Sequence, residues 1–93
     1  MRTVAIARLI CELIESRKWI SWKGKGIREC TDLTKGQVTI GIIYLASKGY
    51  VKKDEPRGRG WWTKTRKFDF YWKIFLGRPK TKFDMKTRKL KYA

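Results

Sequence analysis

The sequence predicts a small α+β domain in which helices pack against a short antiparallel sheet. Three observations lead to this prediction: an N-terminal segment with helical apolar spacing, a helix over 34–48 that runs directly into a β-favouring pair, and an alternating segment over 68–76. A chain of 93 residues has room for one modest core and one domain.

The first helix is expected over residues 3–17. Its apolar residues follow an i, i+3, i+4, i+7, i+8 spacing, which places them on one face: Ile6, Leu9, Ile10, Leu13 and Ile14. Cys11 lies beside this stripe, so it is expected at the margin of the helix or against a second subunit.

A short extended piece and a brief second helix come next. Gly24 to Gly26 is read as a turn before a helical segment around 27–31. We expect four residues to seat this segment on the core, namely Ile20, Ile27, Cys30 and Leu33. Trp19 and Trp22 are expected to pack in the core or at its edge.

The most distinctive segment is a helix over 34–48. Thr34 can cap its first turn, and Gly49 stands where a left-handed residue would end it. Val38, Ile42 and Leu45 share its inner face. The β-branched residues also alternate as in a strand, and Gly41 lowers helix preference by about 1 kcal/mol. Burial of one helix face outweighs these penalties, so a helix is predicted.

Two antiparallel strands are expected after Gly49, at about 50–55 and about 67–76. The basic loop between them contains Pro56, Gly58 and Gly60, which suit a turn. Residues 1–77 are therefore assigned to the domain. Residues 78–93 are assigned to a basic C-terminal tail, which is either flexible or ordered on a partner.

The charge of the chain points to a polyanionic partner. Lys and Arg number 24 against 8 acidic residues, which gives a net charge of +16. Nucleic acid is the first expectation, followed by an anionic membrane surface or an acidic protein. No segment has the roughly 18 apolar residues of a membrane helix, so we expect a cytoplasmic, DNA-associated protein with no membrane partner.

The residue types do not favour catalysis. The chain has no His and two Cys, which cannot complete an ordinary zinc site, so no metal or cofactor is predicted. The acidic residues are mostly spread singly, and neither cysteine has an evident general base. The sequence therefore predicts that the protein is not an enzyme.

The succession from Thr34 through the spaced apolar residues and Gly49 to Val51 resembles the winged helix-turn-helix family, in the small stand-alone form found in archaea and their viruses. The resemblance implies three helices, a two- to three-stranded β-wing, and a recognition helix over 34–48 that enters the major groove. It places these residues at DNA: Thr34, Lys35, Gln37, Thr39 and Tyr44 from the helix, and Arg57, Arg59, Trp61, Lys64, Arg66 and Lys67 from the wing. Lys35 would contact phosphate or guanine, and Gln37 would pair with adenine.

One feature departs from the family. The outward face of the recognition helix shows Ile40 and Ile43, where DNA-reading relatives usually carry polar residues. With Cys11, these residues are the predicted interface of a homodimer. We expect a double-stranded DNA-binding protein that acts as a transcriptional regulator or DNA-coating factor. The alternative is a protein-interaction module or RNA-binding protein whose recognition helix serves oligomerisation.

Overall fold

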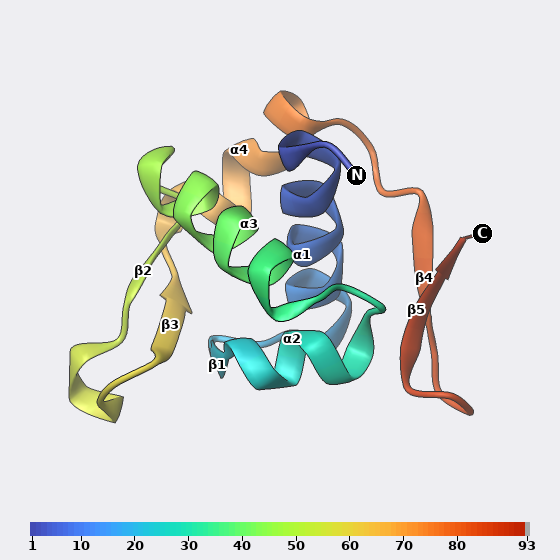
Figure 1. The fold of residues 1–93 in the computed structure, drawn as a ribbon. Coiled ribbons are helices and arrows are strands. Elements are labelled where there is room, and N and C mark those ends of the chain that lie inside the picture. The colour runs from blue at the N-terminus through green and yellow to red at the C-terminus, as the bar shows by residue number, and fades with distance from the viewer. Residues whose placement is uncertain (93) are drawn as a thin grey trace.

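The computed structural model describes residues 1–92 and shows an α+β fold (Figure 1). Within this range there are four α-helices and two small antiparallel sheets. The elements in chain order are α1 (Thr3–Arg17), β1 (Ser21–Lys23), α2 (Gly24–Cys30), α3 (Lys35–Ser47), β2 (Val51–Lys53), a 3-10 turn (Glu55–Arg57), β3 (Trp61–Lys64), α4 (Arg66–Leu76), β4 (Thr81–Asp84) and β5 (Lys89–Tyr92). The sheets have the orders β1-β3-β2 and β4-β5.

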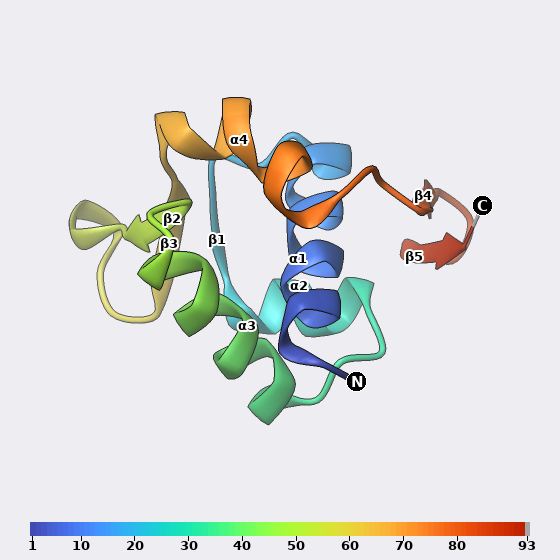
Figure 2. The ribbon, with the colours of Figure 1, turned by 90° about the horizontal axis from the view of Figure 1, so that it is seen from above.

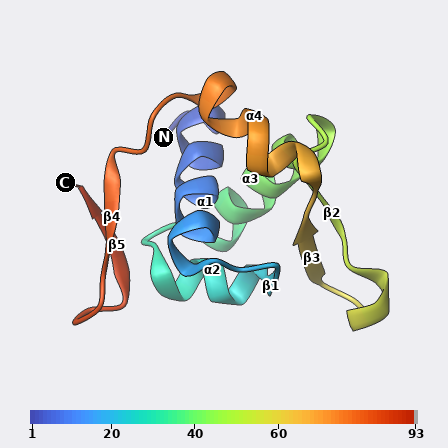
Figure 3. The same ribbon diagram turned by 180° about the vertical axis from the view of Figure 1, so that it is seen from behind.

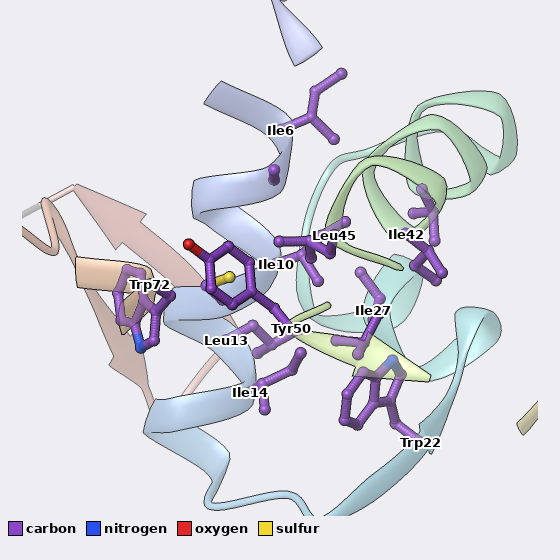
Figure 4. Close-up of a cluster of buried hydrophobic side chains, with 14 of the residues drawn as sticks. Ile6, Ile10, Leu13, Ile14, Trp22, Ile27, Ile42, Leu45, Tyr50 and Trp72 are labelled. Carbon is purple, nitrogen blue, oxygen red and sulfur yellow. The ribbon is translucent and has the colours of Figure 1, made fainter. Parts of the chain in front are cut away.

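Helix α1 is the centre of the fold. It contacts α2, α3, α4 and β4, and its predicted apolar stripe is buried apart from the half-buried Leu9 (Figure 4). Because elements pack on several sides of α1, Cys11 is also completely buried. Cys11 cannot contact a second subunit from this position, so its assignment to a dimer interface is wrong. Burial, reinforced by Glu12 and Glu15, raises the pKa of its thiol, and both cysteines are free.

Helix α3 confirms the predicted helix between Thr34 and Gly49. The Thr34 hydroxyl accepts a hydrogen bond from the Gln37 N–H at 3.2 Å, and the Gln37 side chain accepts one from the Thr34 N–H at 2.9 Å. At the other end Gly49 is left-handed, with a φ of 79°, and Tyr50 N–H donates to Leu45 O. Val38, Ile42 and Leu45 are buried as expected.

The three-stranded sheet corrects the predicted wing. Strand β3 lies between β1 and β2, pairing Trp62 with both Trp22 and Lys53. The second wing strand is therefore Trp61–Lys64 and not 67–76. Strand β2 was predicted close to its observed position. The turn over Glu55–Arg57 and the left-handed Gly58 and Gly60 form the tip between β2 and β3.

The segment predicted as a strand over 67–76 is helix α4. Its buried residues are Phe68, Trp72 and Leu76, which follow an i, i+4, i+8 spacing. The period-two reading was wrong because both faces of this segment are rich in apolar residues, so a helical and an alternating pattern fit equally well. Thr65 fixes the start of α4 through its hydroxyl, which donates to Gly49 O at 2.6 Å.

The C-terminal segment is not a free tail in the described residues. Strands β4 and β5 form a hairpin beside α1, on the side away from the wing (Figure 1). The buried Glu12 carboxylate accepts hydrogen bonds from Lys80 N–H and from the Thr81 hydroxyl, both at 2.6 Å. The Arg17 guanidinium lies 4.8 Å from the ring centroid of Phe83. Of the predicted tail, Ala93 lies outside the described residues.

The second helix is longer than expected. Helix α2 begins at Gly24, inside the segment predicted as a turn. Ile27, Cys30 and Leu33 are buried as predicted, but Ile20 is 70% exposed and does not join the core. Trp22 is buried and Trp19 half-buried, as expected. No helix within residues 1–92 has the length and apolarity needed to cross a bilayer.

Candidate nucleic-acid interface

The hairpin formed by β2, the turn over Glu55–Arg57 and β3 is referred to below as the wing. A groove of about 370 Å³ lies between α2, α3 and this hairpin. It is lined by residues from β1, α2, α3, the wing tip and β3: Lys23, Gly24, Lys25, Arg28, Lys35, Val38, Thr39, Ile42, Ile43, Arg59, Gly60 and Trp62. Figure 1 shows the β2–β3 hairpin standing beside α3, with α2 below α3. Five of the lining residues are Lys or Arg, and no acidic residue among those described lines the groove. The groove is therefore a site of concentrated positive charge.

Helix α3 contributes Lys35, Thr39 and Ile43 to the rim of the groove, four residues apart along one face. The Thr39 hydroxyl donates to Lys35 O at 2.9 Å, so its remaining lone pairs can accept a hydrogen bond. Ile43 is 61% exposed. This face offers one cation, one hydroxyl and one apolar side chain to a ligand.

Three of the α3 residues predicted at DNA do not line the groove: Thr34, Gln37 and Tyr44. The side chains of Thr34 and Gln37 bond to each other's backbone in the cap of α3. Gln37 lines a separate cavity near Leu90 of the C-terminal hairpin. Tyr44 lies beside Lys48, whose Nζ is 5.7 Å from the ring centroid. Gln37 and Tyr44 lie outside this groove because helix geometry turns positions 37 and 44 away from position 35.

At the wing, Arg59 lines the groove and Arg57 does not. The Arg57 guanidinium lies 5.0 Å from the Trp61 ring centroid and its Nε lies 3.5 Å from Asp54. Trp61 is also approached by Lys23, whose Nζ is 5.5 Å from the ring centroid. The Trp61 ring thus holds two cations beside the groove.

The adjacent tryptophans occupy different places, as expected for neighbours on a strand. Trp62 lines the groove and packs against the core, whereas Trp61 lines two hollows outside the groove. Both rings are half-buried. Trp62 is the tryptophan that a ligand in the groove would meet, and sequence reasoning had selected Trp61.

The remaining predicted wing cations lie outside the wing loop. Lys64 ends β3 and pairs with Asp69 at 2.7 Å. Arg66 and Lys67 begin α4, and Lys67 Nζ lies 5.5 Å from the Tyr50 ring centroid. These positions follow from the correction of 67–76 from strand to helix.

Sequence reasoning missed three groove cations, Lys23, Lys25 and Arg28. They flank and follow Gly24 and Gly26, where the only local signal was a basic, glycine-containing turn. Their place in the groove depends on the pairing of β1 with β3, about forty residues away in the chain. The basic residues around Gly24 and Gly26, shortly before α3, are the local signal that could have found them.

Three further observations describe the surface outside the groove: an exposed isoleucine, the arrangement of potential metal ligands and the ion pairs. Ile40 is 50% exposed and lies outside the groove. Within residues 1–92 no group of three or more His, Cys, Asp or Glu residues is arranged to hold a metal ion. Five ion pairs engage Asp32, Asp54, Asp69, Asp84 and Glu15. Much of the positive charge therefore has no acidic counterpart.

Comparison with protein-family models, with curated proteins and with solved structures gave no match for this chain.

Proposed function

We propose that the chain is a winged helix-turn-helix protein that binds double-stranded DNA. The observation that carries the proposal is the groove with five cations and no described acidic lining residue, beside the capped helix α3. Helices α1, α2 and α3 with the sheet β1-β3-β2 supply the elements that such a domain requires. In this arrangement α3 approaches the major groove and the wing approaches the flanking backbone.

Duplex DNA suits the charge and shape of this surface. An α-helix fits the major groove, and cations on both sides of it can neutralise phosphates. On α3, Lys35 would bind phosphate or guanine, and Ile43 would contact a thymine methyl group. Arg59 would bind backbone from the wing, and Lys25 and Arg28 from α2.

Of the two roles expected for a DNA-binding chain, DNA coating is the better supported. The groove face of α3 presents Lys35, Thr39 and Ile43, and the described groove lining contains no Asn or Gln for paired bonds to adenine. Most contacts would therefore go to phosphates, which carry no sequence information directly. A transcriptional regulator would require more reading of base edges than this face offers.

The proposal is tested by fluorescence anisotropy of a labelled random duplex across a salt series. We compare a groove variant, K35A/R59A, with K82A/K86A, which removes the same charge from the C-terminal hairpin. The groove variant should bind more weakly and lose roughly two units of the slope of log affinity against log salt, at about 0.9 per phosphate contact. The hairpin variant should keep a slope close to that of the parent chain.

Two results would count against the proposal. Equal losses in the two variants would show that binding follows net charge and not the groove. Stronger competition by structured RNA than by unlabelled duplex would favour the RNA-binding alternative.

A further inference from the structure

Helix α4 presents a large apolar surface to solvent. Phe70 is 69% exposed, Tyr71 53%, Ile74 80% and Phe75 54%, and we refer to these four residues as the α4 patch. The opposite face of the helix carries the buried Phe68, Trp72 and Leu76. Because four large apolar side chains gathered on one exposed helix face are usually covered by a partner, the α4 patch calls for an occupant.

Basic residues surround the α4 patch. Arg66 and Lys67 lie one turn before Phe70 and Tyr71, and both are exposed. Lys48 reaches the patch from the end of α3, with its Nζ 5.1 Å from the Phe75 ring centroid. The two acidic residues in this region are already paired, Asp69 with Lys64 at 2.7 Å and Glu15 with Lys73 at 2.9 Å.

The basic residues around the α4 patch favour an anionic bilayer over a second copy of the chain as its occupant. A second copy of the chain carries the same net charge of +16 and the same basic residues around its patch, and the nearby carboxylates are already engaged. Like charges placed together across an interface oppose association. An anionic bilayer offers an apolar region for the aromatic and aliphatic side chains and phosphates for the cations.

We propose that the α4 patch docks on the surface of a bilayer that contains anionic lipids. Phe70 and Ile74, at the outermost part of the helix, enter the boundary between headgroups and acyl chains, while Arg66 and Lys67 bind lipid phosphates. This contact lies in the plane of the membrane surface and requires no spanning helix. It differs from the expectation, drawn from the sequence, that the protein has no membrane partner.

The position of the α4 patch leaves the DNA-binding groove free. When the molecule is seen from above, α4 lies along one edge and α3 runs toward the opposite edge (Figure 2), and α4 stands in front of α3 in the view from behind (Figure 3). The groove and the α4 patch therefore face different directions. A chain docked on a membrane through α4 can hold DNA on its other side.

The test is co-sedimentation with vesicles of phosphatidylcholine alone and of phosphatidylcholine mixed with an equal amount of phosphatidylglycerol. The parent chain should bind the anionic vesicles and not the neutral ones. F70S/I74S should lose about tenfold or more in affinity for the anionic vesicles, because two exposed apolar side chains no longer enter the bilayer. R66Q/K67Q should also bind the anionic vesicles more weakly, and its affinity should depend less on salt concentration than that of the parent chain.

The matched control is I20S/I40S, which removes two exposed apolar side chains outside the α4 patch and the groove and leaves the net charge unchanged. It should bind vesicles like the parent. Duplex binding and circular dichroism of F70S/I74S should equal those of the parent, which separates loss of docking from loss of folding.

Three results would overturn the proposal. They are failure of the folded parent chain to bind anionic vesicles, binding by F70S/I74S that equals that of the parent, and a lipid-free dimer that F70S/I74S converts to a monomer. The last result would assign the α4 patch to a second copy of the chain.

Discussion

Gly41 on α3 lies directly against Ile10 on α1. A Cβ atom at position 41 would stand 2.5 Å from Ile10 Cδ1 and 2.8 Å from Ile6 Cγ2. Both distances are shorter than carbon atoms tolerate, so α1 and α3 can approach this closely only because position 41 has no side chain. The same contact fixes the position of the α3 face that lines the groove.

We predict that Gly41→Ala lowers the free energy of unfolding by about 1–2 kcal/mol. Two contacts under 3 Å put the cost of overpacking at about 2–3 kcal/mol, the upper part of its usual range, and a gain of about 1 kcal/mol in helix propensity offsets part of it. Ile10 is completely buried and the Ile6 methyl is attached to Cβ, so neither can move aside freely. Urea unfolding followed by circular dichroism measures the change.

Gly36→Ala is the control for Gly41→Ala on the same helix. Gly36 is exposed, and its nearest neighbour to an added Cβ is Thr34 Oγ1 at 4.0 Å. We expect this variant to gain about 0.5 kcal/mol from helix propensity alone. A Gly41→Ala variant as stable as the parent would contradict the close-contact explanation.

Local signals were sufficient for α1 and α3, and insufficient for α4. The cap at Thr34, the left-handed Gly49 and the spacing of Val38 and Ile42 are all local, so α3 was predictable from its own residues. The assignment of 67–76 depended on tertiary information. Strand β3 is already paired on both edges, with β1 and β2, so no edge of β3 remains for another strand. The segment then buries its apolar residues as a helix.

Some residues of the groove could be predicted from local signals, and others depend on tertiary contacts. Lys35 and Thr39 follow from the start of α3, and Arg59 from the position of the wing tip, so sequence reasoning found them. Lys25 and Arg28 reach the groove through the packing of α2 on α3 and the pairing of β1 with β3, both of which are tertiary contacts.

Glu12 provides a second prediction, because its buried carboxylate anchors the C-terminal hairpin. Glu12→Gln removes the charge that strengthens the hydrogen bonds from Lys80 N–H and the Thr81 hydroxyl. It also places the glutamine NH2 group against one of these two donors, so that one hydrogen bond is lost. We expect the protection of hairpin amides against hydrogen exchange to fall by about 1–3 kcal/mol, with less change in α3.

Glu15→Gln is the matched control for Glu12→Gln. Glu15 lies one turn further along α1 and pairs with Lys73 at the surface. The protection of hairpin amides should therefore fall by less than about 1 kcal/mol in Glu15→Gln. Equal effects of the two variants would show that Glu12 does not hold the hairpin.

The hairpin should also respond to acid through Asp84. Its carboxylate accepts a hydrogen bond from Lys86 N–H at 2.9 Å and pairs with Lys91 at 3.2 Å, and these contacts, Lys86 first, lower the pKa of Asp84. The folded pKa lies below the unfolded one, so the stabilisation is present above the unfolded value of about 4 and is lost as the pH falls through the folded pKa.

The titration of Asp84 can be measured by NMR of its side-chain carboxyl and of the amides at 85–88. The amide shifts should titrate with a midpoint below about 4 in the parent chain. Asp84→Asn should abolish that titration. Amide shifts that titrate in the same way in Asp84→Asn would assign the acid response to another group.

Ile40 and Ile43 give a matched pair that tests both the groove and the predicted dimer. Both are exposed on α3, but only Ile43 lines the groove. Ile43→Glu places a carboxylate among the groove cations, where it competes with DNA phosphates. We expect its affinity for duplex DNA to fall by about tenfold or more, since the carboxylate both repels DNA phosphates and neutralises a groove cation that would otherwise bind one. Ile40→Glu makes the same change in net charge outside the groove, so its effect should be much smaller in the anisotropy assay.

Sedimentation of the same two variants tests the homodimer that was predicted through Ile40 and Ile43. If that interface forms, both substitutions should shift the chain to a monomer, because each buries a carboxylate in an apolar contact. If the DNA groove alone uses this face, the sedimentation of both variants should match that of the parent, and only Ile43→Glu should lose DNA binding. A strong loss of DNA binding in Ile40→Glu without a change in oligomeric state would show that the DNA surface extends beyond the groove along α3.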